Sequence, residues 1–489
     1  MRTGALALFL FLLALAGAAE ATCPIVYNGV SYACTVTSET VSGGVSHFNA
    51  NAFERYAQPL YDGKEDVLEV GGGTAKIFNE YPGAAQWGQL TIFEDLDATS
   101  ITMIHVLDTN PTYSQSWALA SNITTSPCVN TQWCLRVTQH NPSPVGVDKI
   151  VITGTTNWKV AAQYYKDWAS QQSWYHSHGA LAGIALGRVI NCSTTTYSYY
   201  DTNLDGIPAM FAPKQVGCLM TQYRTSTFDV NYPDYTCSGG ANCPAWLQSL
   251  KNTTSIGLPY FNMALWDTTH SGYNAANMCL DSGGSPTVYG GNLRYVDPLL
   301  SSWTTTLRTA FDALQATDTS TSRGVYLDVG TATDSQVCYY SGTPSYTAWI
   351  TGMKNVAAAF TDKIVMFEAG GEQFIPYADI FYLYAVGTTA STTLPTTIGL
   401  WGFIYGSIPN LYLVGMEGGP GDRESDYYRL QYQGRNVFYR GAMFSTAGAE
   451  NEVLWAQLPT TSYARLCEVG WRNRCPDAPR SAAAARTPR

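Results

Sequence analysis

The segment from Arg323 to Asp379 constrains the fold more than any other part of the chain. It contains two short apolar runs, Val-Tyr-Leu-Asp328 and Ile-Val-Met-Phe-Glu368, and each run ends in a carboxylate. Such runs without polar alternation are typical of parallel strands that are buried on both faces. An amphipathic helix is predicted between them from apolar residues at helical spacing: Trp349, Ile350, Met353, Val356, Ala357 and Phe360. The segment therefore predicts a β-α-β unit with an acid at the C-terminal end of each strand.

The composition narrows the classes of partner. The formal net charge is −10, and no basic stripe is present, which argues against a nucleic-acid or anionic-membrane partner. The 33 tyrosines and 13 tryptophans suit a polar, aromatic-lined cleft. With 489 residues, the chain is long enough for several domains with sizeable cores.

The N-terminus has the pattern of a secretory signal peptide. Arg2 precedes an apolar run over residues 5–15, and Ala19-Glu20-Ala21 forms an A-x-A cleavage site. We therefore expect residues 1–21 to be removed and the protein to be secreted. No other long apolar segment predicts a membrane span.

Twelve cysteines fit this oxidising compartment. Local spacing predicts four disulfides, and four further cysteines leave three connectivities open, of which we favour Cys192–Cys218 with Cys279–Cys338. The four local pairs are Cys23–Cys34, Cys128–Cys134, Cys237–Cys243 and Cys467–Cys475. Sequons predict N-glycosylation at Asn122, Asn191 and Asn252.

The order of patterns along the chain predicts an α/β protein in which an antiparallel β-sandwich precedes a (β/α)8 barrel of the TIM type. Short β-rich runs separated by turn residues place the sandwich at 22–157. An aromatic amphipathic segment predicts a linker helix over 158–179. Alternating β and α patterns place the barrel at 180–458, followed by a disulfide-closed segment and a disordered tail at 459–489.

Within the predicted barrel, several elements follow from local pattern. Apolar runs predict strands within 180–190, 259–267 and 397–405. Asp297 and Pro298 are typical of a helix start, because Asp caps a helix and Pro suits its first position. Residues 427–444 are expected to form a helix.

The two strand-end acids indicate glycoside hydrolysis. Neighbouring parallel strands lie about 4.8 Å apart, so carboxyl groups at their ends can stand roughly 5–9 Å apart, as a glycosidase requires. One of the two must remain protonated, which burial and mutual repulsion achieve. Glu372 is a rival for the second acid, because a helical turn from Glu368 would place both on one face.

Longer motifs add a family resemblance. The Asn157–Trp174 segment, the Tyr260–Asp267 strand, Val-Tyr-Leu-Asp328 with Cys338, and the Phe-Glu368-x-x-x-Glu372 motif with Asp379 resemble glycoside-hydrolase-like proteins related to the endo-α-N-acetylgalactosaminidase type. The resemblance implies a β-sandwich followed by a barrel, with Asp328 as nucleophile and Glu368 as general acid/base of a retaining mechanism. In many of those proteins a His- and Gly-rich loop follows the cysteine, where this chain has Ser341–Tyr346.

The sequence thus predicts a secreted O-glycosidase that needs neither a metal nor another cofactor. His176-Ser-His178 lacks an evident third metal ligand. The alternative is a catalytically silent, glycan-binding or structural matrix protein that keeps the fold. We expect the carbohydrate substrate to contact aromatic and polar residues near the predicted strand ends: Trp266, Asp267, His270, Tyr326, Trp401 and Tyr405.

Overall fold

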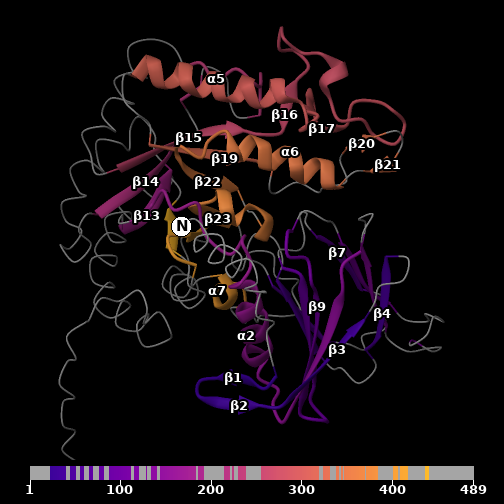
Figure 1. Cartoon of the computed structure of the whole chain (residues 1–489). Helices are drawn as coiled ribbons and strands as arrows, with labels where there is room; N and C mark the ends of the chain where they lie inside the picture. The colour runs from indigo at the N-terminus through magenta and orange to yellow at the C-terminus, as the bar shows by residue number, and fades with distance from the viewer. Residues whose placement is uncertain are drawn as a thin grey trace, which may run out of the picture.

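The computed structural model describes part of the chain, and the described residues form two regions of the fold. They are 23–39, 44–50, 55–59, 65–69, 76–81, 88–111, 115–120, 128, 134–139, 144–182, 185–191, 214–220, 223–224, 229–237, 255–318, 323–330, 338–340, 343–344, 346–368, 371–383, 400–405, 408–416 and 436–439. Figure 1 shows antiparallel strands in one region and a strand cluster covered by helices in the other. The signal-peptide prediction, the sequons at Asn122 and Asn252, and the predicted tail lie outside these residues.

Two antiparallel sheets make up the first region. One has the strand order β4-β11-β10-β7, and the other has the order β3-β12-β9-β8-β5-β6. A separate hairpin, β1-β2, precedes them. The strands are β1 (Ile25–Tyr27), β2 (Val30–Tyr32), β3 (Cys34–Glu39), β4 (Val45–Asn49), β5 (Arg55–Pro59), β6 (Glu65–Glu69), β7 (Lys76–Tyr81), β8 (Leu90–Asp95), β9 (Ser100–Val106), β10 (Gln115–Ala120), β11 (Cys134–Gln139) and β12 (Val147–Thr153).

The larger sheet is buried on both faces at its centre. All seven residues of β9 are buried, although a sandwich strand normally alternates. The reason is that Ile104 and Val106 pack against the smaller sheet. Ile101 and Met103, on the opposite face, join the larger core that continues into the barrel. The sandwich is therefore packed against the rest of the molecule through its larger sheet.

Helix α2 (Trp158–Ala169) fills the junction between the two regions. The Asn157 side chain caps it by accepting a hydrogen bond from the Lys159 amide at 3.2 Å. The helix contacts β8 and β9 on one side and α7 (Leu400–Tyr405) on the other. Its aromatic residues are therefore core residues of the junction, with Tyr165 fully buried.

Eight parallel strands close into a barrel in the second region. Their order is β13-β14-β15-β19-β22-β23-β24-β25, and β25 pairs with β13 to close the ring. Helices α5 (Ser301–Asp318) and α6 (Tyr346–Ala358) connect β15 to β19 and β19 to β22, so the described β/α alternation is clearest here. The strands are β13 (Ala185–Asn191), β14 (Lys214–Met220), β15 (Ser255–Asn262), β19 (Gly324–Asp328), β22 (Ile364–Glu368), β23 (Ile380–Leu383), β24 (Tyr412–Met416) and β25 (Asn436–Tyr439).

An extra three-stranded sheet follows β15. It has the order β16-β18-β17, with β16 at Leu265–Asp267, β17 at Val288–Gly290 and β18 at Leu293–Tyr295. A short 3-10 turn, η4 (Ala275–Asn277), lies between β16 and β17. After β19, a small hairpin pairs β20 (Tyr339–Tyr340) with β21 (Thr343–Pro344). Figure 1 places β16 and β17 on the same side of the barrel as β20 and β21.

Three of the expected disulfides are present: Cys23–Cys34, Cys128–Cys134 and Cys279–Cys338. Cys237 is also disulfide-bonded. The remaining expected partners, Cys192, Cys218, Cys243, Cys467 and Cys475, have side chains outside the described residues. Bonded cysteines fit an oxidising compartment.

Four local expectations for the barrel need correction. The run at 397–405 contains helix α7 instead of a strand, because its apolar side packs onto α2. The segment 427–444 contains strand β25 instead of a helix. The run at 259–267 divides into β15 and β16, because the Asn262 side chain accepts hydrogen bonds from the Ala264 and Leu265 amides and turns the chain. Helix α5 begins at Ser301, after a turn closed by Asp297.

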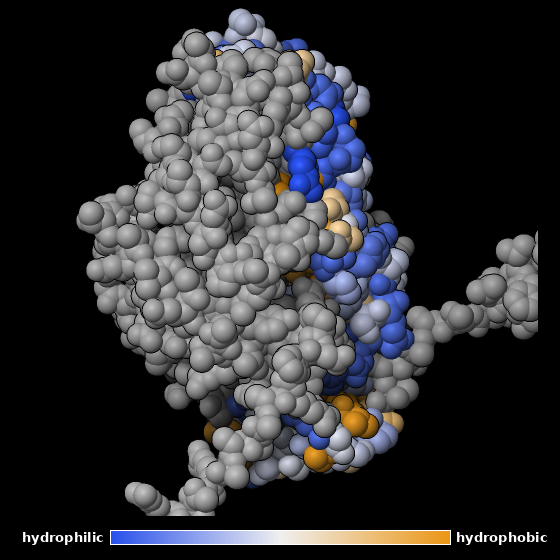
Figure 2. All heavy atoms as spheres, turned by 90° about the vertical axis from the view of Figure 1, so that its left-hand side faces the viewer, coloured by the Kyte–Doolittle hydropathy of each residue, from blue (hydrophilic) through white to orange (hydrophobic). Residues whose placement is uncertain are grey.

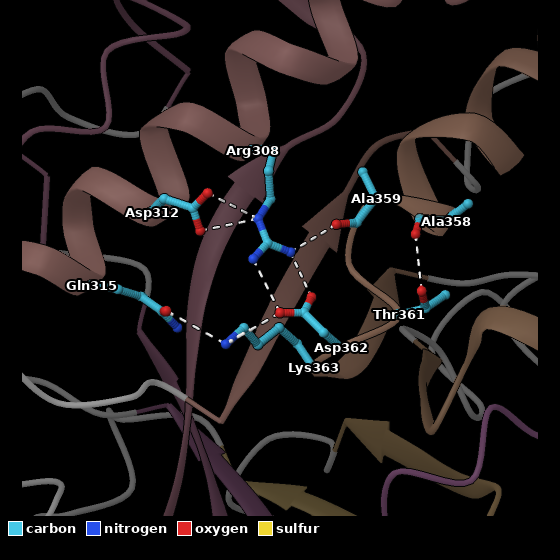
Figure 3. A network of polar contacts seen from close by, with 8 residues as sticks. All are labelled: Arg308, Asp312, Gln315, Ala358, Ala359, Thr361, Asp362 and Lys363. Carbon is cyan, nitrogen blue, oxygen red and sulfur yellow. Dashed lines mark hydrogen bonds and ion pairs between the residues drawn. The ribbon is translucent and has the colours of Figure 1, made fainter.

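A polar network holds α5 to the turn that leads into β22. Arg308 on α5 donates to Asp312 on the same helix, to the carbonyl oxygen of Ala359 and to both oxygens of Asp362 (Figure 3). Lys363 joins the network through Asp362 and Gln315. The hydrogen bonds from Arg308 are the main reason that the pKa of Asp362 is lowered. The network therefore fixes α5 to the chain at the beginning of β22, away from the C-terminal end of that strand.

The described surface in Figure 2 is mainly hydrophilic down the right-hand side of the view, with a small hydrophobic patch at the lower end. At that level Figure 1 places the β1-β2 hairpin, where Val26 and Val30 are exposed. None of the described helices has the length and hydropathy of a membrane-spanning segment.

Candidate active site

The register of three neighbouring barrel strands brings the two predicted acids together. Asn262 of β15 lies opposite Asp328 of β19, and Tyr260 lies opposite Tyr326. Because side chains two residues apart point to the same side of a strand, Tyr326 and Asp328 face the same way. On the next strand Leu327 lies opposite Phe367, so Glu368 stands at the same level as Asp328. Both acids end their strands at the carboxyl-terminal edge of the barrel, where barrel enzymes carry their catalytic groups.

Asp328 is a buried carboxyl group with hydroxyl and carboxyl partners. Only 3% of it is exposed. Tyr326 donates to its Oδ1 at 2.7 Å, and Tyr260 also hydrogen-bonds to it. A further hydrogen bond joins Asp328 to Glu368, which requires a proton between the two carboxyl groups. Burial and then the charge of Glu368 raise the pKa of Asp328 well above its ordinary value.

This contact corrects the expected geometry. The two carboxyl groups hydrogen-bond directly, whereas the strand spacing predicted a separation of roughly 5–9 Å. The physical reason is that a shared proton converts the repulsion of two buried carboxylates into an attraction.

Val329 supplies a backbone donor to the same pair. Its φ of 70° lies in the left-handed region, which is costly for a β-branched residue. In this conformation its amide donates to Oε2 of Glu368 at 2.7 Å. Glu368 is half-buried, so it is the more accessible acid of the pair. The strained residue thus positions the acid on the adjacent strand, as is common at functional sites.

A loop after β14 extends the site outward through tyrosines. The hydroxyl groups of Tyr232 and Tyr260 lie 2.7 Å apart, which links the loop to Asp328 through Tyr260. Arg224 stacks on the Tyr232 ring, with its guanidinium carbon 4.3 Å from the ring centre. The same guanidinium donates to the carbonyl oxygens of Val230 and Asp234. These contacts fix the loop against the barrel edge.

The structure separates the two rival acids. Glu372 belongs to the 3-10 helix η6 (Glu372–Tyr377) and is fully buried. Its Oε1 accepts hydrogen bonds from the hydroxyl groups of Tyr165 on α2 and Tyr405 on α7. Tyr165 in turn accepts from the Gln89 amide beside β8. Glu372 therefore lies at the junction of the sandwich, the linker helix and the barrel, and Glu368 is the acid that contacts Asp328.

The expected sugar-contact residues are divided among several places. Tyr326 contacts Asp328, as described above. Tyr405 is buried and bonded to Glu372, which suits a structural role. Trp401 belongs to α7, but its side chain lies outside the described residues.

The other three expected contacts lie in or beside β16. Trp266 packs on Trp303, with ring centres 5.3 Å apart. His270 accepts from the Gly272 amide through Nδ1. Asp267 is 2% exposed and accepts hydrogen bonds from the Asn231 and Thr269 amides, so it supports the loop and is shielded from solvent.

Four functional candidates were missed by the sequence interpretation. Tyr260 could have been found, because it lies two residues before the strand-end Asn262 and so points to the same side as that residue. Tyr232 and Asp229 fall in a turn-like segment without periodicity. Tyr289 lies in the extra three-stranded sheet, and no local sequence pattern predicts where that sheet packs.

The histidine pair noted in the sequence has no metal-site geometry in the described part of the chain. His178 Nδ1 lies 3.0 Å from Asp379 Oδ2. This hydrogen bond is the main cause of the raised pKa of His178. Asp379 also accepts from the Val365 amide at 3.0 Å, so the pair connects the linker segment to β22.

Three solved glycosidase structures have a similar fold. The ligand-free alpha-N-acetylgalactosaminidase NagBb from Bifidobacterium bifidum aligns with a TM-score of 0.64 at 10% identity, over 90% of this chain and 82% of its own. The GH36 alpha-galactosidase AgaB from Geobacillus stearothermophilus aligns with a TM-score of 0.56 at 8% identity, over 86% of this chain and 62% of its own. The galactosidase domain of the alpha-galactosidase-sucrose kinase AgaSK has the same TM-score at 9% identity, over 89% and 62%. At these identities the likeness shows a shared fold.

No curated protein matches the sequence. One family model does, the domain of unknown function DUF6259, over residues 146–413. The match begins just before β12, includes the linker helix and extends through β23 into β24, so it contains both Asp328 and Glu368. Because it covers more than half of the 489 residues, the chain belongs to the DUF6259 family.

Proposed function

We propose that this protein is a secreted glycoside hydrolase that cleaves α-linked O-glycosides with retention of configuration. Asp328 acts as the nucleophile and Glu368 as the general acid/base. The observation that carries the proposal is the hydrogen-bonded pair of carboxyl groups at the ends of two adjacent barrel strands. The proposal also includes two expectations from the sequence: that the barrel is of the (β/α)8 type, and that the chain is related to the endo-α-N-acetylgalactosaminidase type.

The protonation state of the pair suits the first step of a retaining mechanism. That step needs one ionised carboxylate and one protonated carboxyl group, and a pair that shares a proton has this composition. Two hydroxyl groups, from Tyr326 and Tyr260, donate to Asp328 and favour its ionised form. A sugar that separates the two groups moves the charge of Glu368 away from Asp328 and so removes one of the two main causes that raise the pKa of Asp328, which can then act as the ionised nucleophile.

Catalysis then follows from the separated pair. Asp328 attacks the anomeric carbon, and Glu368 gives its proton to the leaving oxygen as the glycosidic bond breaks. A water molecule next loses a proton to Glu368 and displaces Asp328 from the anomeric carbon. Retaining enzymes hold their carboxyl groups about 5–5.5 Å apart, so the substrate must open the present contact by a small movement of Glu368.

The structural neighbours suggest the substrate class. Those described above are named as enzymes that act on α-linked N-acetylgalactosamine or galactose. We therefore assign the site to α-glycosides of the galactose series. The bonded cysteines support the secreted location.

The competing glycan-binding function would be favoured if an arginine or lysine neutralised the nucleophile. The charged group with the largest effect on Asp328 is Glu368, which is an acid. A carboxylate pair poised to share one proton has a chemical use in an enzyme and none in a passive sugar site.

Activity measurements test the proposal. The purified protein is assayed against p-nitrophenyl glycosides of α-galactose and α-N-acetylgalactosamine, with β-galactose as the stereochemical control. We expect hydrolysis of an α-glycoside, with proton NMR showing the α-anomer as first product. Asp328→Asn should lower kcat by at least about a thousand-fold. Asp312→Asn, the same change at a half-exposed position on α5, should have wild-type activity.

The role of Glu368 has its own signature. Glu368→Gln should slow hydrolysis of an alkyl glycoside far more than that of the matching glycosyl fluoride, because fluoride leaves without a proton donor. Equal losses on both substrates would remove the acid/base assignment. Full activity in Asp328→Asn would remove the whole proposal.

A further inference from the structure

Two segments from different barrel loops are joined outside the carboxyl pair. The first is residues 229–235, after β14, and the second is the β16-β18-β17 sheet, after β15. Asp267 at the end of β16 links them, because its Oδ2 accepts from the Asn231 amide at 2.7 Å and its own amide donates to the Tyr232 carbonyl at 3.0 Å. We call this combined structure the rim.

An aromatic series connects the outer strand of the rim to the loop that follows Asp328. Tyr289 on β17 meets Tyr295 edge-on, with ring centres 5.6 Å apart. Tyr295 meets Trp349 of α6 in the same way at 5.7 Å. The Trp349 indole then donates to the carbonyl oxygen of Gly330, two residues after Asp328, at 3.3 Å. The Tyr289 ring is therefore held in a defined position relative to the carboxyl pair.

Covalent and backbone links fix the same sheet to the loop after β19. The disulfide between Cys279 and Cys338 joins the two segments. Beside it, the Tyr339 amide donates to the Leu280 carbonyl at 2.8 Å. Within the rim, the Cys279 amide donates to the Tyr295 carbonyl at 2.9 Å. These links hold the rim rigidly against the edge of the barrel. A ligand that binds to the rim would therefore meet side chains that are already in position.

Exposure increases outward from Asp328 to the rim. Asp328 is 3% exposed, Glu368 is half-buried and Tyr289 is 45% exposed. Burial raises the pKa of Tyr289, and the nearby charges of Asp229, Glu368 and Asp328 raise it further. Asp229 is exposed, and its Oδ1 accepts from the Tyr232 hydroxyl at 3.2 Å. An exposed aromatic ring and an exposed carboxylate therefore lie in segments that are linked to the pair.

We propose that Tyr289 and Asp229 form a second sugar subsite, which binds the sugar on the leaving-group side of the scissile bond. This inference rests on the proposed glycosidase function and extends it. Aromatic faces stack on the apolar faces of sugar rings, and a carboxylate accepts hydrogen bonds from sugar hydroxyl groups. Of the two acids of the pair, Glu368 has the larger electrostatic effect on Tyr289, and Glu368 is the acid that protonates the leaving oxygen. The site therefore prefers an α-linked oligosaccharide over a single sugar with a small leaving group.

Binding to a non-hydrolysing protein tests the subsite directly. In the Asp328→Asn background, calorimetry measures the dissociation constants of stachyose and of galactose. Adding Tyr289→Ala should weaken stachyose binding about tenfold, equal to about 1.4 kcal/mol, and change galactose binding less than twofold. Tyr289→Phe should bind stachyose as the tyrosine does, because the ring face remains. Val288→Ala, on the opposite face of β17, is the matched control and should have no effect.

Kinetics separates this inference from the proposed function. With Asp328 intact, Tyr289→Ala and Asp229→Asn should raise KM for stachyose and leave turnover of α-galactosyl fluoride unchanged. If wild-type protein hydrolyses neither substrate, the proposed function fails. If it hydrolyses the fluoride but Tyr289→Ala affects both ligands equally, or neither, the subsite is overturned. Absence of stachyose binding to the Asp328→Asn protein overturns it as well.

Discussion

At the scale of single residues, the chemistry of the site follows from how few water molecules can reach Asp328. A carboxyl group that is 3% exposed loses most of its hydration, and the nearby Glu368 adds repulsion to its ionised form. Hydroxyl groups from Tyr326 and Tyr260 compensate only in part, because the pKa of Asp328 is still raised. Tyr326 comes from the same strand and Tyr260 from the next, so the local fold supplies both partners.

The raised pKa predicts a stability gain on removing the acid. Between the unfolded pKa, about 4, and the higher folded pKa, the unfolded chain is ionised while the folded protein keeps the proton. Stability therefore falls as pH rises through this window. Asp328→Asn cannot ionise, so its Tm at pH 7 should exceed that of the wild type, by about 1 °C per kcal/mol for a chain of this length. Below pH 4 the difference should disappear. Thermal unfolding from pH 3.5 to 8 measures it, and an asparagine variant that is less stable at pH 7 would contradict this explanation.

At the scale of elements, close approach of α6 to the chain before α5 holds the β-α-β unit together. A Cβ added at Gly352 of α6 would lie 2.3 Å from the Pro298 Cβ and 2.5 Å from its carbonyl carbon. Neither neighbour is a flexible side-chain end, so the helix itself would have to move. The Arg308 network, which starts from the middle of α5, restrains that movement (Figure 3).

Gly352→Ala should therefore destabilise the protein by about 1–3 kcal/mol, as overpacking does. The sign is diagnostic, because glycine to alanine in an open helix position stabilises by up to about 1 kcal/mol. Chemical denaturation measures the change. Gly290→Ala is the control, since its Cβ meets nothing within 4 Å. A stabilised Gly352→Ala protein would show that α6 can shift freely.

At the scale of the whole molecule, the sandwich and the barrel share one core. Residues of β8, β9 and β12 belong to the same buried cluster as α2 and the barrel strands. Glu372 lies at this junction with hydroxyl donors from α2 and α7. A buried carboxylate depends on such donors, so its partners matter more for stability than for chemistry.

Tyr165→Phe should consequently reduce the free energy of unfolding by about 1–3 kcal/mol, because it removes a donor from a buried acid. Activity per folded molecule should remain near that of the wild type. Tyr273→Phe is the control, since the hydrogen bond that Tyr273 forms within the described part of the chain comes from its backbone amide. Denaturation followed in parallel with the α-glycoside assay tests both statements. A large loss of kcat without a loss of stability would place Glu372 in the catalytic machinery after all.

The sequence interpretation succeeded where short-range pattern is sufficient and failed where packing decides. Two apolar runs that each end in an acid are enough to predict strands β19 and β22 and to predict that their C-terminal ends are adjacent. The run at 397–405 has β-branched and aromatic residues like theirs, but contact with α2 makes part of it a helix. Strand β25 was missed because a four-residue strand that closes a barrel draws its hydrogen bonds from β13 and β24, far away in sequence.

By itself, the sequence determined the strand-end acids, the linker helix pattern and the pairing of nearby cysteines, because each depends on residues close together in the chain. Only the tertiary structure decided that Asp328 and Glu368 touch, that Glu372 faces the linker helix, and that Tyr289 and Asp229 stand outside the pair. Those outcomes depend on the register between strands and on loops that meet over the barrel. Contacts between residues distant in sequence leave no periodic signal, so only the folded chain shows which groups share a site.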